Sequence, residues 1–73
     1  MDVDARGLKC PLPIVRLTKA VKLAMQGDKI QIQADDAAFE PDVRAWCRKT
    51  GNALVSLTQQ GKDTVAVIRK EVL

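Results

Sequence analysis

The chain has 73 residues, of which 47% are hydrophobic, and a formal net charge of +3 from 12 Lys and Arg against 9 Asp and Glu. A chain of this length is expected to form one domain over residues 1–73 with a small core, because folding buries only about 60% of its unfolded surface. It contains no histidine and two cysteines, Cys10 and Cys47, so we expect no metal, no cofactor, no disulfide framework and no Cys-His catalytic pair.

The N-terminal residues predict a short first strand and a reducing location. The strand is expected over residues 3–5. The run Met1-Asp2-Val3-Asp4 is acidic and lacks the apolar stretch of a signal peptide, and no segment of the chain reaches membrane-spanning length. With so few cysteines, the sequence predicts a protein of the cytoplasm.

Residues 11–26 predict an amphipathic helix, because apolar residues recur there at three- and four-residue steps. Pro11 suits the first helical turn, and Gly27 suits the left-handed position just past the end. The polar side of this helix is basic and, because it follows Cys10, is expected to dock an acidic partner surface; the alternative is a helix face that is only solvated. Its cations are Arg16, Lys19 and Lys22.

The middle of the chain predicts a strand followed by a second helix. Residues 30–34 alternate between apolar and polar, which is a strand pattern that ends at Asp35-Asp36. The second helix is expected to follow Pro41 and to stop at Gly51. Phe39 is expected to lie just before this helix and to pack against its first turn, as in a hydrophobic staple.

Two further β-rich runs, residues 53–58 and 64–69, flank a hairpin turn at residues 60–63. The predicted element order is therefore βαβαββ. Every strand after the first has a polar alternate face, and each helix has one apolar stripe. The expected fold is α+β, a two-layer sandwich with two helices packed on one face of a four-stranded mixed sheet.

Cys10 is expected to carry the chemistry, and its neighbours favour an exposed helix cap. Pro11 disfavours helical backbone geometry at Cys10, which suits a residue that caps a helix N-terminus. Pro11 and Pro13 lack a backbone N–H. The N–H groups left free in the first turn are therefore those of residues such as Leu12 and Ile14, which can face a sulfur anion. The sequence thus predicts a thiolate stabilised at the helix N-terminus; the alternative is a buried, inert cysteine.

Nearby cations are expected to strengthen this effect. A helix N-terminus stabilises an anion by about 0.3–1 kcal/mol, whereas lowering a thiol pKa from about 8.5 to about 7 requires ~2 kcal/mol. Lys9, with Arg6 or Arg16, is expected to supply the difference. We therefore predict that the pKa of Cys10 is moderately lowered.

Cys47 shares the apolar face of the second predicted helix with Trp46, so we predict that it packs in the core. The sharper alternative is a resolving cysteine that forms a disulfide with Cys10, which requires Cα atoms within about 7 Å of each other. The isolated aspartates Asp4 and Asp36 are expected to cap or form turns rather than to transfer protons.

The run from Asp4 to Pro13, DARGLKCPLP, resembles the D-x-x-G-L-x-C-P-x-P signature of the TusA/SirA family of sulfur-carrier proteins. The similarity extends to residues 46–51, WCRKTG, and covers essentially the whole chain. It implies a sulfurtransferase in which Cys10 accepts sulfane sulfur as a persulfide and transfers it to a cysteine of an acceptor protein. Many relatives have His where this chain has Asn52, so a binding function of that imidazole is not expected here.

The resemblance also implies partners and pathways. The expected sulfur donor is a cysteine desulfurase or a rhodanese, and the expected acceptor is a DsrE-like or other sulfur-acceptor protein. The family serves tRNA thiolation, molybdenum-cofactor supply and dissimilatory sulfur oxidation. The predicted site is Cys10, supported by Arg6, Gly7, Lys9, Pro11 and Pro13.

Two other classes of function compete with this hypothesis. One is a redox-sensing or protein-interaction module in which Cys10 and Cys47 form a reversible disulfide. The other is RNA binding, which the positive charge suggests. The two aromatic residues, Trp46 and Phe39, are better used in packing than in stacking on bases, so we expect no direct nucleic-acid binding and no membrane partner.

Overall fold

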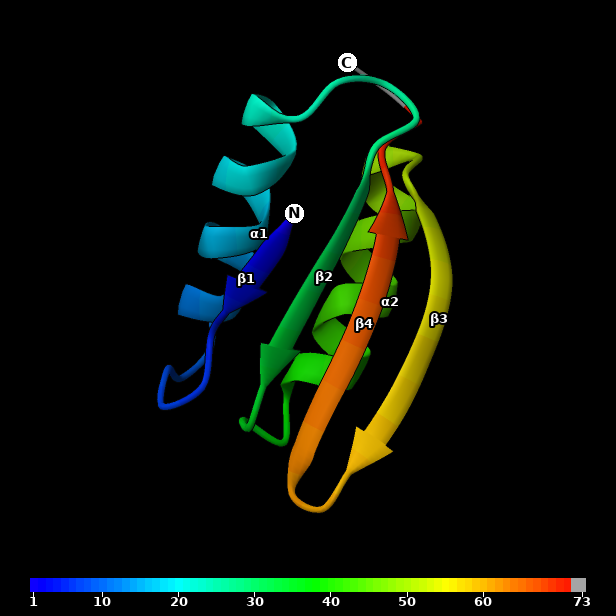
Figure 1. The fold of residues 1–73 in the computed structure, drawn as a ribbon. Coiled ribbons are helices and arrows are strands. Elements are labelled where there is room, and N and C mark those ends of the chain that lie inside the picture. The colour runs from blue at the N-terminus through cyan, green and yellow to red at the C-terminus, as the bar shows by residue number, and fades with distance from the viewer. Residues whose placement is uncertain (72–73) are drawn as a thin grey trace.

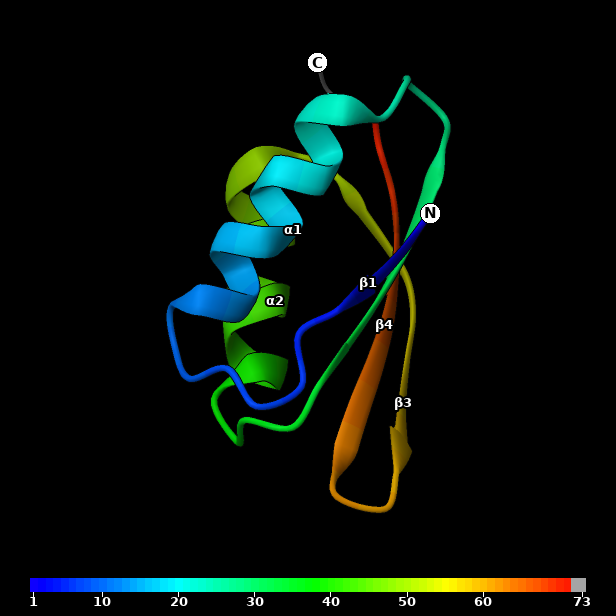
Figure 2. The same ribbon diagram turned by 60° about the vertical axis from the view of Figure 1, so that its left-hand side comes forward.

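The computed structural model describes residues 1–71 and contains the elements expected from the sequence, in the order βαβαββ. The strands are β1 (Asp2–Asp4), β2 (Lys29–Ala34), β3 (Ala53–Gln60) and β4 (Asp63–Arg69), and the helices are α1 (Leu12–Leu23) and α2 (Phe39–Thr50). The strands form one sheet in the order β1-β2-β4-β3, in which β1 is parallel to β2 and the other neighbours are antiparallel. Both helices cover the same face of this sheet (Figures 1 and 2), so the predicted α+β sandwich is confirmed.

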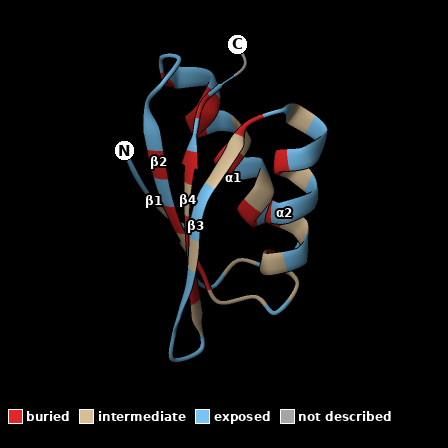
Figure 3. Ribbon diagram, turned by 90° about the vertical axis from the view of Figure 1, so that its right-hand side faces the viewer, coloured by how far each residue is buried: buried red, intermediate tan, exposed pale blue. Residues whose placement is uncertain are grey.

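The core lies between the sheet and the two helices, where Figure 3 shows the buried positions gathered. In the central strands, Ile30 pairs with Ile68 and Ile32 pairs with Ala66, and all of them are fully buried. Because side chains alternate along a strand, the glutamines between these residues point to the opposite, open face. The helices add the large buried side chains of Leu17, Phe39 and Val43.

The edge strand β3 is interrupted by a bulge, where the register with β4 shifts between Leu54 and Ser56. A bulge twists an edge strand and makes it a poorer template for pairing with another chain. The predicted hairpin is confirmed, and Gly61 in its turn has a φ of 64°. None of the helices within residues 1–71 combines the length and apolar character needed to cross a membrane.

The first helix is shorter than the sequence predicts. It ends at Leu23, and the next residue, Ala24, is extended. Asp28 then closes a tight turn, since its carboxylate accepts the Met25 N–H at 3.0 Å and its own N–H donates to the Met25 carbonyl at 3.0 Å. Gly27 lies inside this turn with a φ of 91° and donates to the Lys70 carbonyl at 2.7 Å, so the prediction that it directly ends the helix was wrong.

The second helix begins earlier than predicted, at Phe39 rather than after Pro41. Pro41 is tolerated there because the N–H groups of a first turn have no partner within the helix. Phe39 is therefore the first helical residue, and its side chain is 1% exposed in the core rather than capping the helix from outside. Gly51 ends the helix as predicted, in the left-handed conformation with its N–H on the Cys47 carbonyl at 2.9 Å.

A matched pair of leucine substitutions tests this packing. Leu17 is fully buried, whereas Leu23, on the same helix, is 80% exposed. We expect Leu17→Ala to lower the free energy of unfolding by about 2–5 kcal/mol, because it leaves a cavity, and Leu23→Ala to change it by less than about 0.5 kcal/mol. Urea denaturation of both variants measures the difference, and equal losses would contradict the placement of α1.

Candidate functional site

Cys10 is exposed at the end of the loop that joins β1 to α1. This loop lies beside the connection from β2 to α2, at one end of the sheet (Figures 1 and 2). Two aspartates of that connection hold it. Asp35 accepts the Gly7 N–H at 3.0 Å, and Asp36 accepts the Cys10 N–H at 2.8 Å. The backbone of the cysteine is thus anchored while its side chain remains open to solvent.

The anchoring role of Asp35 was missed from the sequence, and Asp36 was expected only as a turn or cap residue. A usable signal was present, because β1 and β2 are parallel and the carboxyl ends of neighbouring parallel strands meet at the same edge of a sheet. Asp35 and Asp36 directly follow β2, and so they meet the loop that follows β1. Gly7 has a φ of 81° in this loop, a conformation that strains any residue with a Cβ.

The prediction that Cys10 caps α1 was wrong. The capping position is Pro11, which follows a cis peptide bond, and Cys10 precedes it. The Leu12 N–H, expected to face the sulfur, instead donates to the Lys9 carbonyl at 2.8 Å. Pro13 is buried in the first turn. The helix N-terminus therefore lies one residue further along the chain than predicted, with Pro11 rather than Cys10 at the capping position.

The arginines expected to stabilise the thiolate are bound elsewhere. Arg6 forms two hydrogen bonds to the Asp4 carboxylate, at 2.9 and 3.0 Å, and Arg16 donates to the Asp4 carbonyl at 3.5 Å. The side-chain and backbone hydrogen bonds from Arg6 lower the pKa of Asp4 to about 2. Both arginines thus bind Asp4, and neither contributes to the shift in the pKa of Cys10. The Asp4 carboxylate also accepts the Arg6 backbone N–H at 3.0 Å, so Asp4 forms a turn as predicted.

Cys10 faces an apolar groove of about 290 Å³ between the two helices. Its other lining residues are Pro11 and Ile14 on one side and Asp42, Ala45, Trp46 and Lys49 on the other. Asp42 therefore lines the same groove as the Cys10 thiol. Hydrogen bonding with Asp42, then loss of hydration, then the negative charges of Asp42 and Asp36 raise the pKa of Cys10. The predicted lowering of this pKa was therefore wrong.

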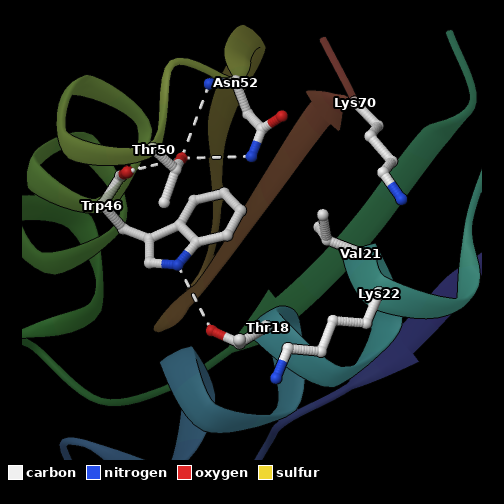
Figure 4. Close-up of a pocket in the computed structure, with 7 residues that line it drawn as sticks. All are labelled: Thr18, Val21, Lys22, Trp46, Thr50, Asn52 and Lys70. Carbon is white, nitrogen blue, oxygen red and sulfur yellow. Dashed lines mark hydrogen bonds between the residues drawn. The ribbon is translucent and has the colours of Figure 1, made fainter. Parts of the chain in front are cut away.

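Trp46 forms a wall of this groove and also of a second pocket, of about 190 Å³, shown in Figure 4. Its indole N–H donates to the Thr18 hydroxyl at 3.2 Å, which ties α2 to α1. The Thr50 hydroxyl donates to the Trp46 carbonyl at 2.8 Å and accepts from the Asn52 amide at 3.1 Å. Asn52 is buried, and its side-chain oxygen accepts the Glu71 N–H at 3.0 Å, so it joins the start of β3 to the segment after β4 at the same end of the sheet.

The remaining residues singled out from the sequence, Cys47 and three lysines, do not line the groove beside Cys10. Cys47 is 6% exposed in the core, as predicted, and burial raises its pKa. Both cysteines are free thiols, and the alternative of a disulfide between them stays a prediction. Lys9 is exposed next to Cys10 in the chain. Lys19 and Lys22 are exposed further along α1, and Lys22 lines the second pocket.

Comparison with known proteins gives one consistent family. The family model described as "Sulfurtransferase TusA" matches residues 1–70. A "Putative sulfur carrier protein" of Neisseria meningitidis serogroup A is 42% identical over 69 residues, which is 93% of each chain. The sulfur carrier protein TusA of Allochromatium vinosum is 33% identical over 69 residues, covering 94% of this chain and 91% of that one.

A solved structure supports the fold independently. The crystal structure of a SirA-like protein from Desulfitobacterium hafniense superposes with a TM-score of 0.82 and covers 97% of both chains. The two sequences are 19% identical, so the likeness concerns the fold alone. It matches the two helices and four-stranded mixed sheet described above.

Alkylation of Cys10 tests the anionic surroundings of the sulfur. Only the thiolate reacts with iodoacetamide, and a raised pKa means that the thiolate forms at higher pH than in an unfolded chain. In a Cys47→Ala variant, we expect the rate to rise around a midpoint above the value of about 8.5 for free cysteine, and to move back to it in urea. Mass spectrometry follows the reaction, and a midpoint below the unfolded value would contradict this site geometry.

Proposed function

We propose, since this chain belongs to the TusA sulfurtransferase family, that it is a sulfur carrier which holds sulfane sulfur as a persulfide on Cys10. The observation that carries this proposal is the exposure of Cys10 on an anchored loop, in contrast to the buried Cys47. A carrier sulfur must be reached in turn by a donor and an acceptor. An accessible side chain on a fixed backbone meets that requirement.

The proposed reaction consists of two transfers of a sulfur atom between cysteines. In loading, the Cys10 thiolate attacks the outer sulfur of a donor persulfide, the sulfur–sulfur bond of the donor breaks, and the donor leaves as a thiolate. In delivery, an acceptor thiolate attacks the outer sulfur on Cys10, and Cys10 leaves as a thiolate. The sulfane sulfur keeps its oxidation state throughout, so the exchange needs no external oxidant or reductant.

The supporting residues have distinct proposed roles. Gly7 permits the turn that brings the loop to Asp35, and Pro13 anchors the first turn of α1 in the core. Pro11 lines the groove next to the sulfur. Lys9, which is exposed and adjacent to Cys10 in the chain, is proposed to meet a partner surface rather than to activate the thiol.

The outer side of α1 is the proposed docking surface for protein partners. It carries the exposed cations Arg16, Lys19 and Lys22 and, close to Cys10 in the chain, the large apolar side chains of Leu12 and Val15, which are 49% and 41% exposed. Apolar contacts beside a basic rim suit an acidic partner, whose approach the charges would steer. The proposed donor is a cysteine desulfurase or a rhodanese, and the proposed acceptor is a DsrE-like or similar protein.

This chemistry is compatible with tRNA thiolation, molybdenum-cofactor supply and dissimilatory sulfur oxidation, since each needs protein-bound sulfane sulfur. We place it in the reducing cytoplasm, where a thiol such as Cys10 stays available for exchange. Direct contact with nucleic acid is not part of the proposal, because Trp46 is engaged with Thr18 and Phe39 is buried.

Intact-mass analysis of cysteine variants tests the persulfide. After incubation with a cysteine desulfurase and cysteine, the wild-type chain and Cys47→Ala are expected to gain the mass of one sulfur atom, and reduction should remove it. Cys10→Ser is expected to gain none, because no other exposed thiol is present. Sulfur uptake by Cys10→Ser would refute the assignment.

Charge reversal tests the docking surface. We expect Lys19→Glu to slow loading from a protein donor several-fold and to weaken its dependence on salt, since charges at an interface rim act mainly on the association rate. Lys62→Glu, a matched exposed control in the β3–β4 turn, should leave the rate unchanged. Loading from a small-molecule persulfide should be the same in all three proteins. Equal rates from the protein donor would place the docking surface elsewhere.

A further inference from the structure

Asp42 lies in the first turn of α2 and lines the groove that contains Cys10. Its side chain is half-buried. The three ion pairs among residues 1–71 engage Asp4, Glu40 and Glu71, and none of them includes Asp42. Asp42 and Cys10 line the same groove, and Asp42 is the largest cause of the raised pKa of the Cys10 thiol. A half-buried carboxylate that forms none of these ion pairs thus lines the same groove as the Cys10 sulfur.

The charges around the sulfur come from three parts of the chain. The β2–α2 connection contributes Asp36, whose carboxylate accepts the Cys10 N–H at 2.8 Å. Helix α2 contributes Asp42 beside the sulfur and Lys49 two turns further along the groove. The segment before α1 contributes the exposed Lys9. The groups that act on the sulfur most directly are therefore the two carboxylates.

We propose that Asp42 destabilises the persulfide on Cys10 relative to the free thiol. Its carboxylate accepts a hydrogen bond from the unloaded thiol and repels the negative charge of the loaded persulfide, so that transfer of the sulfur to an acceptor is favoured over its retention on Cys10. This inference rests on the proposed function of Cys10 as a sulfur carrier. A persulfide is a stronger acid than the corresponding thiol, so at neutral pH the loaded site is anionic and the unloaded site is neutral. A fixed negative charge beside the sulfur therefore raises the free energy of the loaded state relative to the unloaded one.

The same carboxylate can carry the proton through each transfer. In loading, the S–H bond of Cys10 breaks and its proton passes to Asp42 while the sulfur bonds to the outer sulfur of the donor; the departing donor thiolate then takes that proton. In delivery, the acceptor thiol passes its proton to Asp42 as its sulfur bonds to the outer sulfur on Cys10, the sulfur–sulfur bond of Cys10 breaks, and the departing Cys10 thiolate takes that proton. Each exchange converts one thiol and one persulfide into another such pair, so atoms, protons and electrons balance.

The test compares Asp42→Asn with two matched variants. Asp42→Glu keeps the charge beside the sulfur. Glu40→Gln removes a charge from the same helical turn, but Glu40 faces Arg44 at 3.5 Å and Gln59 at 3.2 Å rather than the groove. Each protein is loaded by a desulfurase with cysteine, separated from the donor and equilibrated with reduced glutathione at neutral pH. Intact mass then gives the ratio of loaded to unloaded chain.

We expect Asp42→Asn to raise this equilibrium ratio several-fold, and Asp42→Glu and Glu40→Gln to stay near the wild-type value. The alkylation midpoint of Cys10 should also move to lower pH in Asp42→Asn alone, an effect that a merely structural role of Asp42 would not produce. An unchanged ratio or midpoint in Asp42→Asn, or an equal shift in Glu40→Gln, would overturn the inference. Circular dichroism confirms folding, and Asp42→Ser replaces Asp42→Asn if that variant does not fold.

These outcomes separate the inference from the proposed function. If the wild-type chain gains no sulfur on Cys10, the carrier assignment fails, and the alkylation midpoint still reports whether Asp42 holds the thiol proton. If loading is normal but Asp42→Asn behaves like the wild type, the carrier assignment stands and the role of Asp42 is refuted.

Discussion

The hydrogen bonds from the Gly7 and Cys10 N–H groups to Asp35 and Asp36 determine where the reactive sulfur lies. They exist because β1 runs parallel to β2, which brings the ends of both strands to the same edge of the sheet. Neither peptide N–H belongs to a helix or strand, and each would otherwise need water as a partner. The two carboxylates therefore fix the loop, the start of α1 and the mouth of the groove together.

That anchor also sets the electrostatics of the sulfur. The Asp36 carboxylate that binds the Cys10 N–H also places a negative charge near the sulfur, and Asp42 of α2 adds another. Cys10 is thereby accessible while its pKa is raised, so at a given pH a smaller fraction of it is thiolate than in a free cysteine. For a carrier that must react only with a docked partner, accessibility and low intrinsic reactivity are complementary. A docked partner can bring a cation that offsets the negative charges of Asp36 and Asp42.

The width of the groove depends on how the two helices pack. The hydrogen bond from Trp46 to Thr18 joins α2 to α1 midway along both, and the fully buried Leu17 and Val43 fix the distance of each helix from the sheet. Since protein cores are close-packed, a change in these side chains would move α2, and with it Asp42, relative to the sulfur. The core thus positions the site although it contributes no reacting group.

The sequence by itself determined the element order, the sandwich, the burial of Cys47 and the exposure of Cys10, because periodicity and turn residues are local features that can be identified without knowledge of the fold. Only the tertiary structure decided the end of α1, through the bond from Gly27 to Lys70, and the charge around the sulfur. Arg6 and Arg16 are near Cys10 in sequence but bind Asp4, whereas Asp36 and Asp42 are distant in sequence and face it. Electrostatic interaction depends on distance in space, which strand pairing and helix packing set and sequence spacing does not.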